Sequence, residues 1–447
     1  MKSNVSYKEI FDISFPMMLG SFSSALAAMA DTMFMGSIGH AHMDATGFCG
    51  LFLFIISMIG WAFSKGIQIL IAQFDGANKT GQIGTYFDTS LIILGTFGFL
   101  SFLVFKFFSA PILSLFISDP IVLQYCIEFS DMRSWSFLFV NLSYLMASFY
   151  TGLGKTKILI LSTALTSLSN IGLNYLLALG NWGFPRLEVT GSALATNISD
   201  FLCLLVFVGS FWWNKHYIST YQLFKFKSIT AAVASKITNI SSPLIIQHFV
   251  SLGSWLVFFS WIESMGSKSL AASMIVKSIY MVISIPGFSL SSATNTIVGN
   301  LVGQKAIHQI LPTIKKIILI NFAIITVILI ITFLLKDYWL LSFTQDREIL
   351  DLSQQPLMLV IMAMFIFPFG NTFFQGVVSL GDTKKSLIIE SLTLLVYMGY
   401  AYTVIKVLKL NLAWAWSTEF FYWIFLFLFS ILYFRFSSWK KDLSMSE

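Results

Sequence analysis

The 447-residue chain is poor in charge: 11% of its residues are Asp, Glu, Lys or Arg, whereas 56% are hydrophobic. A soluble globular domain carries about a quarter of its residues as charged side chains. No polar segment here is long enough to fold as a separate soluble domain. Apolar stretches of about 20 residues, the length that crosses a bilayer as a helix, recur along the chain. The composition therefore predicts an all-α polytopic membrane protein.

Cysteine is also scarce, and the three cysteines all lie inside apolar segments. We expect Cys49, Cys126 and Cys203 to be small core residues, not disulfide partners or metal ligands. Catalytic signatures such as H-E-x-x-H and G-x-S-x-G are missing as well. The segment GLGKTK at 152–157 lacks the earlier glycine of a phosphate-binding loop, because Phe149 stands there. These absences predict a protein that is not an enzyme and needs no cofactor.

Twelve apolar segments of helical length can be placed between turn-like or charged breaks. They run over 10–37, 46–73, 87–109, 125–152, 158–180, 188–213, 236–263, 270–300, 313–336, 350–380, 384–407 and 411–436. The first follows a leader that carries Glu9 and Asp12 beside its lysines, so we expect an uncleaved span and not a signal peptide.

The basic residues predict the orientation of these spans. Of the 27 Lys and Arg residues, 17 lie in the two tails and the even-numbered loops, and six lie in the odd-numbered loops. Lys and Arg favour the cytoplasmic side, so both termini are expected in the cytoplasm. The net charge of +6 is spread over these inner loops, where it faces anionic lipid. Because the charge forms no single patch, the sequence gives no indication of nucleic-acid binding.

The two halves of the chain repeat at an offset of 227 residues. The offset aligns helix-breaking and turn residues in order: Pro16 with Pro243, Gly39 with Gly266, Gly76 with Gly303, and Gly154 with Gly381. Six spans per half give both halves the same sense in the membrane, hence a parallel pseudo-twofold repeat. We therefore expect an N-terminal lobe at 1–213, a cytoplasmic linker at 214–235 and a C-terminal lobe at 236–447.

Asp31 is the only charged residue in the core of the first apolar segment. An ionised carboxylate at bilayer depth is costly unless it is paired or hydrated, so its presence predicts a functional site. Asn170 and Asn174 lie four residues apart, as do Ser192 and Thr196, so each pair shares one helix face. Their oxygens can ligate a hard cation or hydrogen bond a carboxyl group. The alternative is that they only hold transmembrane helices together.

The repeat provides a control for this site. Its counterparts in the second half are Phe258 for Asp31, Tyr397 for Asn170 and Ala401 for Asn174. The second half keeps the scaffold without the polar groups, which favours a function confined to the first lobe. Two further groups of candidates are secondary: Asp200, well inside the sixth span, and a loop cluster of His40, His42 and Asp44 whose metal binding stays open.

In the order and spacing of its motifs the chain resembles the multidrug and toxic compound extrusion (MATE) transporters, closest to their bacterial DinF-like branch. The resemblance covers nearly the whole chain and rests on Pro16 with Asp31 fifteen residues later, G-x-x-G at 36–39, AQFDGA at 72–77, GLGKTK at 152–157, the Asn170/Asn174 pair and GSALAT at 191–196. It implies two six-helix lobes that rock between inward- and outward-open forms. It also implies export of small organic, often cationic compounds from the bacterial inner membrane, in exchange for protons or sodium.

Carried onto matching positions, the resemblance makes Asp31 the coupling carboxylate and Asn170 and Thr196 its polar partners. Asn174 stands where many bacterial members have a second Asp, and Gln247 and His248 stand in the seventh span where some carry a carboxylate. The first departure weakens a sodium site, and the second puts a coupling route through the second lobe in doubt. Pro16, which removes a helix hydrogen bond, and its repeat partner Pro243 are the expected hinges. We expect a monomer that contacts membrane lipid.

The single carboxylate favours a proton as the coupling ion, because sodium gains most from paired negative charge. Two other interpretations remain. A lipid-linked saccharide flippase of the same superfamily should line its cavity with several cations, and only Lys65, Lys106 and Lys277 are available within the spans. A non-transporting membrane protein should show a catalytic cluster or a ligand domain, and neither is visible.

The orientation can be tested by labelling single cysteines with an impermeant maleimide. A cysteine at Lys225, in an even-numbered loop, should react only from the cytoplasmic side, and one at Lys268, in an odd-numbered loop, only from outside. Labelling of both positions from one face would contradict the twelve-span arrangement.

Overall fold

The computed structural model describes residues 4–227 and 229–440, and within them every regular element is a helix. This confirms the all-α expectation. The chain divides into two compact units: an N-terminal unit, Leu19–Ser241, and a C-terminal unit made of Met1–Met18 and Ser242–Glu447. Both divisions fall inside long helices. The first lies within α1 (Tyr7–Ile38), and the second lies within α9 (Ala231–Glu263).

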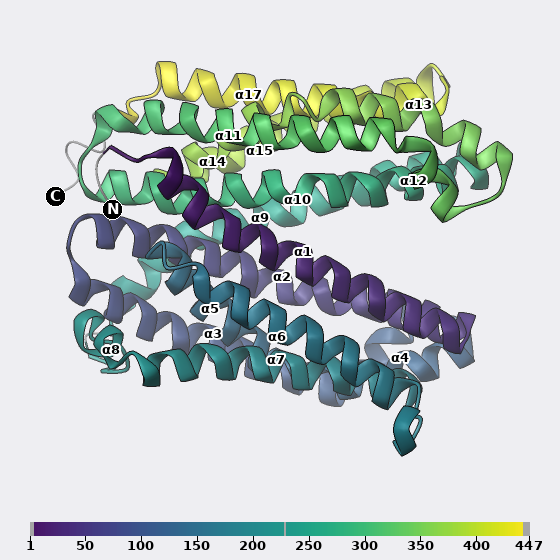
Figure 1. The fold of residues 1–447 in the computed structure, drawn as a ribbon, viewed down its shortest axis with the longest axis horizontal. Helices are drawn as coiled ribbons and strands as arrows, with labels where there is room; N and C mark the ends of the chain where they lie inside the picture. Colours follow the sequence, from purple (N-terminus) through teal and green to yellow (C-terminus); the bar gives the residue numbers. More distant parts are fainter. Residues whose placement is uncertain (1–3, 228, 441–447) are drawn as a thin grey trace. The chain divides into compact units, whose positions relative to one another are not determined.

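The N-terminal unit contains most of α1 and the following six long helices and one short one. These are α2 (His40–Gly76), α3 (Thr80–Leu113), α4 (Pro120–Arg133), α5 (Ser136–Gly152), α6 (Lys157–Leu173), α7 (Glu188–Trp213) and α8 (Lys215–Tyr221). A π-helical segment, η1 (Asn174–Ala178), continues α6, and a short 3₁₀ turn, η2 (Asn181–Gly183), follows it. Helix α5 packs against α2, α3 and α7, and α6 lies along α7 (Figure 1).

The C-terminal unit begins with most of α9 and repeats this order of elements. Its helices are α10 (Ser267–Gly303), α11 (Ile307–Leu334), α12 (Lys336–Phe343), α13 (Arg347–Ala363), α14 (Phe367–Ser379), α15 (Thr383–Tyr402), the π-helical η3 (Thr403–Val407), α16 (Leu412–Trp416) and α17 (Thr418–Phe436). Helix α10 packs against α11, α13 and α14, and α17 lies against α14 and α15.

Ten of the described helices are each long and apolar enough to cross a membrane, and the pair α13–α14, bent by 51°, provides an eleventh span. The expected span at 125–152 is divided between α4 and α5. At about 1.5 Å per residue, neither α4 nor α5 alone covers a hydrocarbon core of about 30 Å. The two helices meet next to Ser134, and within the described residues this pair is not among the candidate spans.

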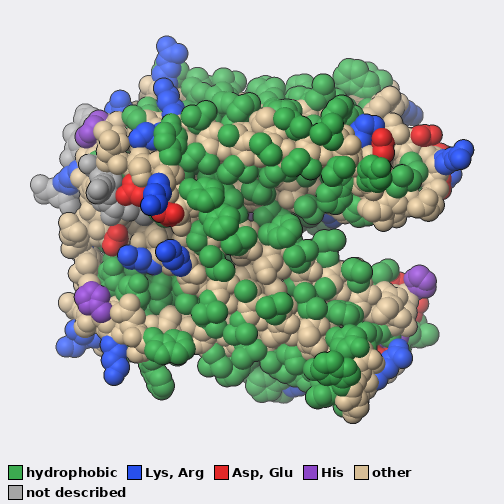
Figure 2. All heavy atoms as spheres, in the orientation of Figure 1, with side chains coloured by type: hydrophobic (Ala, Val, Ile, Leu, Met, Phe, Trp, Pro, Cys, Tyr) green, Lys and Arg blue, Asp and Glu red, His purple; other side chains and the backbone are tan. Residues whose placement is uncertain are grey.

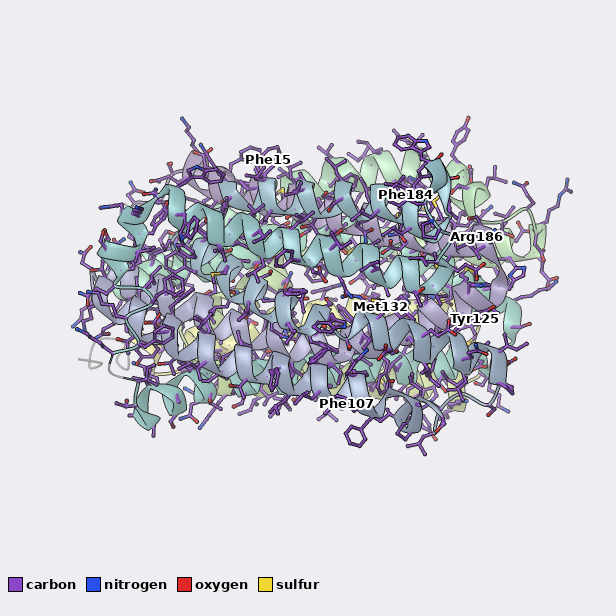
Figure 3. The ribbon with its side chains drawn as sticks, turned by 90° about the horizontal axis from the view of Figure 1, so that it is seen from below. Phe15, Phe107, Tyr125, Met132, Phe184 and Arg186 are labelled. Carbon is purple, nitrogen blue, oxygen red and sulfur yellow. The ribbon has the colours of Figure 1, made fainter. Side chains whose placement is uncertain are left out.

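The surface of each unit fits a bilayer. On the face shown in Figure 2, hydrophobic side chains cover the length of the helices, and charged side chains gather at the helix ends. Phe107 on α3 is 69% exposed and points away from the helices (Figure 3). Exposure of such an apolar side chain to water is unfavourable in free energy, whereas lipid tails solvate it well.

The structure confirms the 227-residue repeat. Helices α2 and α10 both contain 37 residues and begin at positions 40 and 267. The break between α4 and α5 recurs between α13 and α14, and the π-helical turn η1 recurs as η3. Asp119 and Asp346, also 227 apart, cap the N-termini of α4 and α13 by accepting backbone N–H groups through their side chains. The shared scaffold therefore includes capping residues that the sequence comparison had not singled out.

The segment expected as a linker, 214–235, contains α8 and is held by a buried carboxylate of α3. Asp88 is 1% exposed, and its two oxygens each accept one backbone N–H at 2.8 Å, from Phe224 and from Phe226. Both phenylalanines have positive φ, which is costly for residues with bulky side chains. Gly84 allows the loop to approach, because a Cβ there would lie 2.2 Å from the Tyr221 carbonyl oxygen. Asp88 therefore fixes the loop to the N-terminal unit.

Replacing Asp88 should destabilise the protein strongly. In Asp88→Ala, two backbone donors in strained residues lose a charged acceptor, which predicts a loss of about 2–3 kcal/mol in the free energy of unfolding. The matched control is Asp119→Ala, which removes an exposed helix cap and should cost about 1 kcal/mol. Denaturant unfolding of both variants in detergent compares them. Equal losses for both would contradict the anchoring role of Asp88.

Candidate functional site

The site is built around Asp31, which α1 places in the interior of the N-terminal unit. The Asn174 amide donates to the Asp31 carboxylate at 2.7 Å. The same amide nitrogen also donates to the Asn170 carbonyl at 3.0 Å, which fixes the rotamer of Asn174. Asn174 is fully buried, so its contact with Asp31 is shielded from solvent. The structure thus brings together two predicted residues that are 143 positions apart.

Two further predicted residues form a second pair beside the first. The Asn170 amide donates to the Thr196 hydroxyl at 3.1 Å, and this hydroxyl donates to the Ser192 carbonyl at 3.0 Å. Ser192 contributes its backbone oxygen to this network. The side-chain oxygens of Asn170 and Asn174 are buried and have no hydrogen-bond partner among the described residues. Such orphaned acceptors are rare in folded proteins and usually have a functional explanation.

Local backbone structure explains how α6 and α7 meet at this network. Asn174 begins the π-helical segment η1, where one extra residue per turn rotates the following side chains. Gly191 on α7 packs directly onto this segment, because a Cβ at Gly191 would lie 2.5 Å from the Leu177 carbonyl oxygen. The close approach brings Thr196 within reach of Asn170. Because the C-terminal unit also has the π turn, the turn belongs to the shared scaffold and not to the site alone.

The equivalent place in the C-terminal unit is filled by aromatic rings. Phe258, the counterpart of Asp31, lies 5.7 Å from Tyr397, the counterpart of Asn170, measured between ring centroids. Trp416 packs edge-on against Phe258 at 5.8 Å. All three rings are nearly completely buried. The spatial match between the two networks supports the control drawn from the repeat: the scaffold alone does not require Asp31.

A cavity of about 870 Å³ opens beside Asp31 within the N-terminal unit. Its apolar wall contains methionines and phenylalanines from α1, α2, α4 and α5, including Met35, Met43 and Phe54. Its polar wall contains the following side chains: Asp31, Asp44, Thr46, Arg133, Ser136, Tyr144, Ser192 and Thr196. A volume of this size suits a small organic molecule.

Asp200, the secondary candidate, is one half of an ion pair. Its carboxylate lies 3.0 Å from Arg133 Nη1 and also accepts a hydrogen bond from the Ser136 hydroxyl. Arg133 ends α4 and lines the cavity. Its partner lies 67 residues further along the chain on another helix. Only the three-dimensional fold joins them, so neither spacing nor periodicity could have indicated the pair.

The remaining candidates lie outside this network. Pro16 and Pro243 sit inside α1 and α9, which run unbroken past both of them. Each proline nevertheless lies within three residues of a division between the compact units. Gln247 and His248 belong to α9 in the C-terminal unit, and the buried Gln247 side-chain oxygen has no hydrogen-bond partner within the described part of the chain. They therefore do not join the Asp31 network.

His40, His42 and Asp44, which were expected in a loop, lie instead in the first turns of α2. His42 Nε2 lies 2.9 Å from the Glu188 carboxylate and its ring packs on Tyr125. Arg186 lies 3.3 Å from the same Glu188, at the start of α7 (Figure 3). In the described part of the chain, no group of three or more His, Cys, Asp or Glu side chains could hold a metal ion.

The C-terminal unit contains a buried carboxylate of its own. Glu390 on α15 is 2% exposed and accepts hydrogen bonds of 2.8 Å from the hydroxyls of Ser251 on α9 and Tyr422 on α17. The family resemblance implies such a group in the seventh span, where this chain has Gln247 and His248 instead. Its repeat counterpart in the N-terminal unit is Thr163, so the alignment of the two halves does not indicate a carboxylate at this position.

Comparison with known proteins identifies the family. The MatE family model matches residues 16–176 and 243–403, two ranges that are offset by the same 227 residues as the repeat. Among similar proteins, the "Probable multidrug resistance protein NorM" of Thermotoga maritima is 24% identical, over 97% of this chain and 93% of its own length. The "Probable multidrug resistance protein YoeA" of Bacillus subtilis is also 24% identical, over 80% of this chain and 77% of its own length.

Solved structures agree on the fold. A multidrug resistance MATE family transporter of the MOP superfamily, in its outward-facing conformation, is similar with a TM-score of 0.87 and 20% identity, over 98% of this chain and 97% of that one. A MOP superfamily transporter from Pyrococcus furiosus gives a TM-score of 0.88 and 18% identity, over 98% and 96% of the two chains. The family model matches the chain twice, and the two matches agree with the repeated helical fold. The chain therefore belongs to the MatE family and is a multi-pass membrane transporter, not an enzyme.

Proposed function

We propose that the protein exports small organic compounds, cationic ones among them, across a bacterial plasma membrane in exchange for an inward flow of ions. The observation that carries the proposal is the position of Asp31, a carboxylate in an apolar helix at the wall of a cavity of about 870 Å³. The relatives named as multidrug resistance proteins support the substrate class.

The exchange follows from the two charge states of Asp31. When ionised, Asp31 attracts a cationic guest into the cavity and accepts the Asn174 amide. When an inward-moving ion neutralises it, the attraction for the guest is lost and the carboxyl group can pack against its neighbours. An ion drives a conformational change only through its different affinity for the two conformations. Asp31 supplies that difference because its neutral form tolerates the apolar interior and its charged form does not.

The positions of two prolines support a rocking motion of two lobes. The excess of Lys and Arg in the tails and even-numbered loops supports a cytoplasmic location for both termini. Pro16 removes one backbone hydrogen bond from α1, and Pro243 does the same in α9. Both lie next to the divisions between the compact units. Bending at these two points would move one unit against the other while each keeps its internal packing.

The proposed coupling ion is a proton, with sodium as the second candidate. Around Asp31 the network supplies one negative charge, because Asn174 stands where a second carboxylate would strengthen a sodium site. A proton requires only the single carboxylate. The observation that favours sodium is the pair of buried amide oxygens of Asn170 and Asn174. Neither oxygen has a hydrogen-bond partner in residues 4–227 and 229–440, so both could serve as ligands.

The cavity wall argues against a lipid-linked saccharide flippase. A pyrophosphate would need several cationic side chains, and the lining of this cavity contains one, Arg133, which Asp200 already neutralises. Lys106 is paired with Asp131 at 2.8 Å and lies outside the lining. The polar wall suits a guest with compensating positive charge better than a polyanion.

Asp31→Asn should abolish gradient-driven export while the protein still folds and inserts. The amide preserves the shape of the side chain but can neither bind a proton nor carry a charge. Ethidium efflux from proteoliposomes measures the effect, and we expect a loss of at least tenfold in rate. The matched control is Asp337→Asn, an exposed carboxylate of α12 paired with Lys336, which should retain full activity. Normal efflux by Asp31→Asn would remove Asp31 from the coupling mechanism.

Proton coupling predicts full activity without sodium. In sodium-free liposomes, a pH gradient alone should drive wild-type transport. Asn174→Asp adds a second carboxylate beside Asp31 and should introduce a response to sodium. If wild-type transport requires sodium and ignores the pH gradient, the argument from a single charge is wrong and the amide oxygens are adequate ligands.

A further inference from the structure

A group of charged side chains joins the first turns of α2 and α7 in the N-terminal unit. His42 Nε2 lies 2.9 Å from one oxygen of the Glu188 carboxylate, and Arg186 Nε lies 3.3 Å from the other. The imidazole ring also packs on Tyr125 of α4, with 4.2 Å between the ring centroids. Tyr125 and Arg186 lie at the same end of the helices in Figure 3. We call His42, Glu188 and Arg186 the α2–α7 clamp.

The backbone at the centre of this clamp is strained. Glu188, the first residue of α7, has a φ of 51°. This is the left-handed region, which costs free energy for a residue other than glycine and persists only where surrounding contacts hold it. The carboxylate of Glu188 makes such contacts on both of its oxygens. Weakening one of them therefore favours a change of the backbone where α7 begins.

The α2–α7 clamp is connected to Asp31 through the π-helical segment η1. The backbone N–H of Leu187, the neighbour of Glu188, donates to the Leu177 carbonyl in η1 at 2.9 Å. The same segment begins at Asn174, whose amide donates to the Asp31 carboxylate. A shift at the start of α7 therefore moves the backbone that carries the amide partner of Asp31.

The repeat indicates that the scaffold does not require this clamp. The C-terminal unit has the same π-helical turn, yet Ser269 stands at the position of His42 and Ala415 at that of Glu188. Neither counterpart is charged, and Ala415 is not among the described residues with positive φ. The clamp and its strain occur in the unit that contains Asp31, which supports a role in the function of that site.

We propose that His42 and Glu188 are positioning residues for the Asp31 site, and that protonation of His42 tightens their hold on η1. A protonated imidazole pairs with a carboxylate through a charge-assisted hydrogen bond, whereas a neutral ring makes a weaker one. A histidine takes up its proton between about pH 5 and pH 8. Acid on this side of the membrane therefore orders η1, and alkali loosens it. The inference rests on the proposed export function, because it describes how the coupling site of that function is regulated.

The other charged or titratable groups around His42 are Arg186 and Tyr125, on the neighbouring elements, and His40 and Asp44, on the same turns of α2. Arginine, tyrosine and aspartate side chains do not ordinarily change charge between about pH 5 and pH 8. His40 carries the same imidazole as His42 but is exposed, and the described part of the chain records no hydrogen bond or ion pair for it. It therefore provides a matched control.

Hydrogen–deuterium exchange, read by mass spectrometry on the full-length protein in detergent, measures the order of η1. The reporting amides are those of Leu179, Gly180 and Leu187, which donate to carbonyls of η1. Protection is compared at about pH 5.5 and about pH 7.5, after correction for the intrinsic pH dependence of exchange. In the wild type it should be about threefold higher at the lower pH, the effect of one partly exposed ion pair.

Two variants remove the pair and keep a side chain that can hydrogen bond. In His42→Gln and in Glu188→Gln, protection of these amides should be the same at both pH values, whereas His40→Gln should respond like the wild type. Ethidium counterflow at equal pH on both sides of proteoliposomes gives a second measurement. His42→Gln should be about threefold slower than the wild type at about pH 5.5 and equally fast at about pH 7.5.

The two measurements separate this inference from the export function. If the exchange results are as expected but the wild type does not transport ethidium, the export function is contradicted and the positioning role of the clamp stands. The positioning role is overturned if wild-type protection is the same at both pH values. It is also overturned if His42→Gln and Glu188→Gln both keep the wild-type response, or if His40→Gln loses it as they do.

Discussion

The hydrogen bond from the Asn174 amide to Asp31 is the contact on which the site depends, because it holds a carboxylate in surroundings that disfavour charge. Much of the surrounding fold is arranged to make this contact. The π-helical turn rotates the end of α6, and Gly191 lets α7 approach it. Asn170 and Thr196 then complete a polar layer between the two helices. Without this layer, Asp31 would face only apolar side chains and the cavity.

The two units have the same arrangement of long helices but carry different side chains, polar or aromatic, at equivalent positions. Where the N-terminal unit has Asp31 and amides, the C-terminal unit has the tilted and edge-on rings of Phe258, Tyr397 and Trp416. Both sets of side chains fill the space between the helices, the polar set through hydrogen bonds and the aromatic set through ring contacts. The long helices and the π-helical turn are shared by the two units, so the contrast at these positions comes chiefly from the side chains. The repeat therefore separates what the fold needs from what the function needs.

The spans, the repeat and the Asp31 network could be predicted because each leaves a local or periodic signal. The length of the apolar segments indicated the helices, and one fixed offset between the two halves indicated the repeat. A four-residue spacing placed Asn170 and Asn174 on one helix face. The ion pair of Arg133 with Asp200 and the anchoring of the 222–226 loop by Asp88 were not predictable in this way. Both join side chains or backbone from distant helices, so their existence depends on the tertiary packing. The break between α4 and α5 was missed although Asp131 and Arg133 directly precede it, because residues 125–152 together have the length of one span.

The two crossings between the units are helices and not loops, since the divisions fall at Met18–Leu19 in α1 and at Ser241–Ser242 in α9. A flexible loop lets two bodies move freely, whereas a helix resists bending and transmits force along its axis. Any movement of the units must therefore change the curvature of α1, the same helix that carries Asp31 about 22 Å beyond Pro16 at about 1.5 Å per residue. Asp31 and the division near Pro16 therefore lie on one continuous helix, so a bend of α1 at Pro16 would change the direction of the segment that carries Asp31.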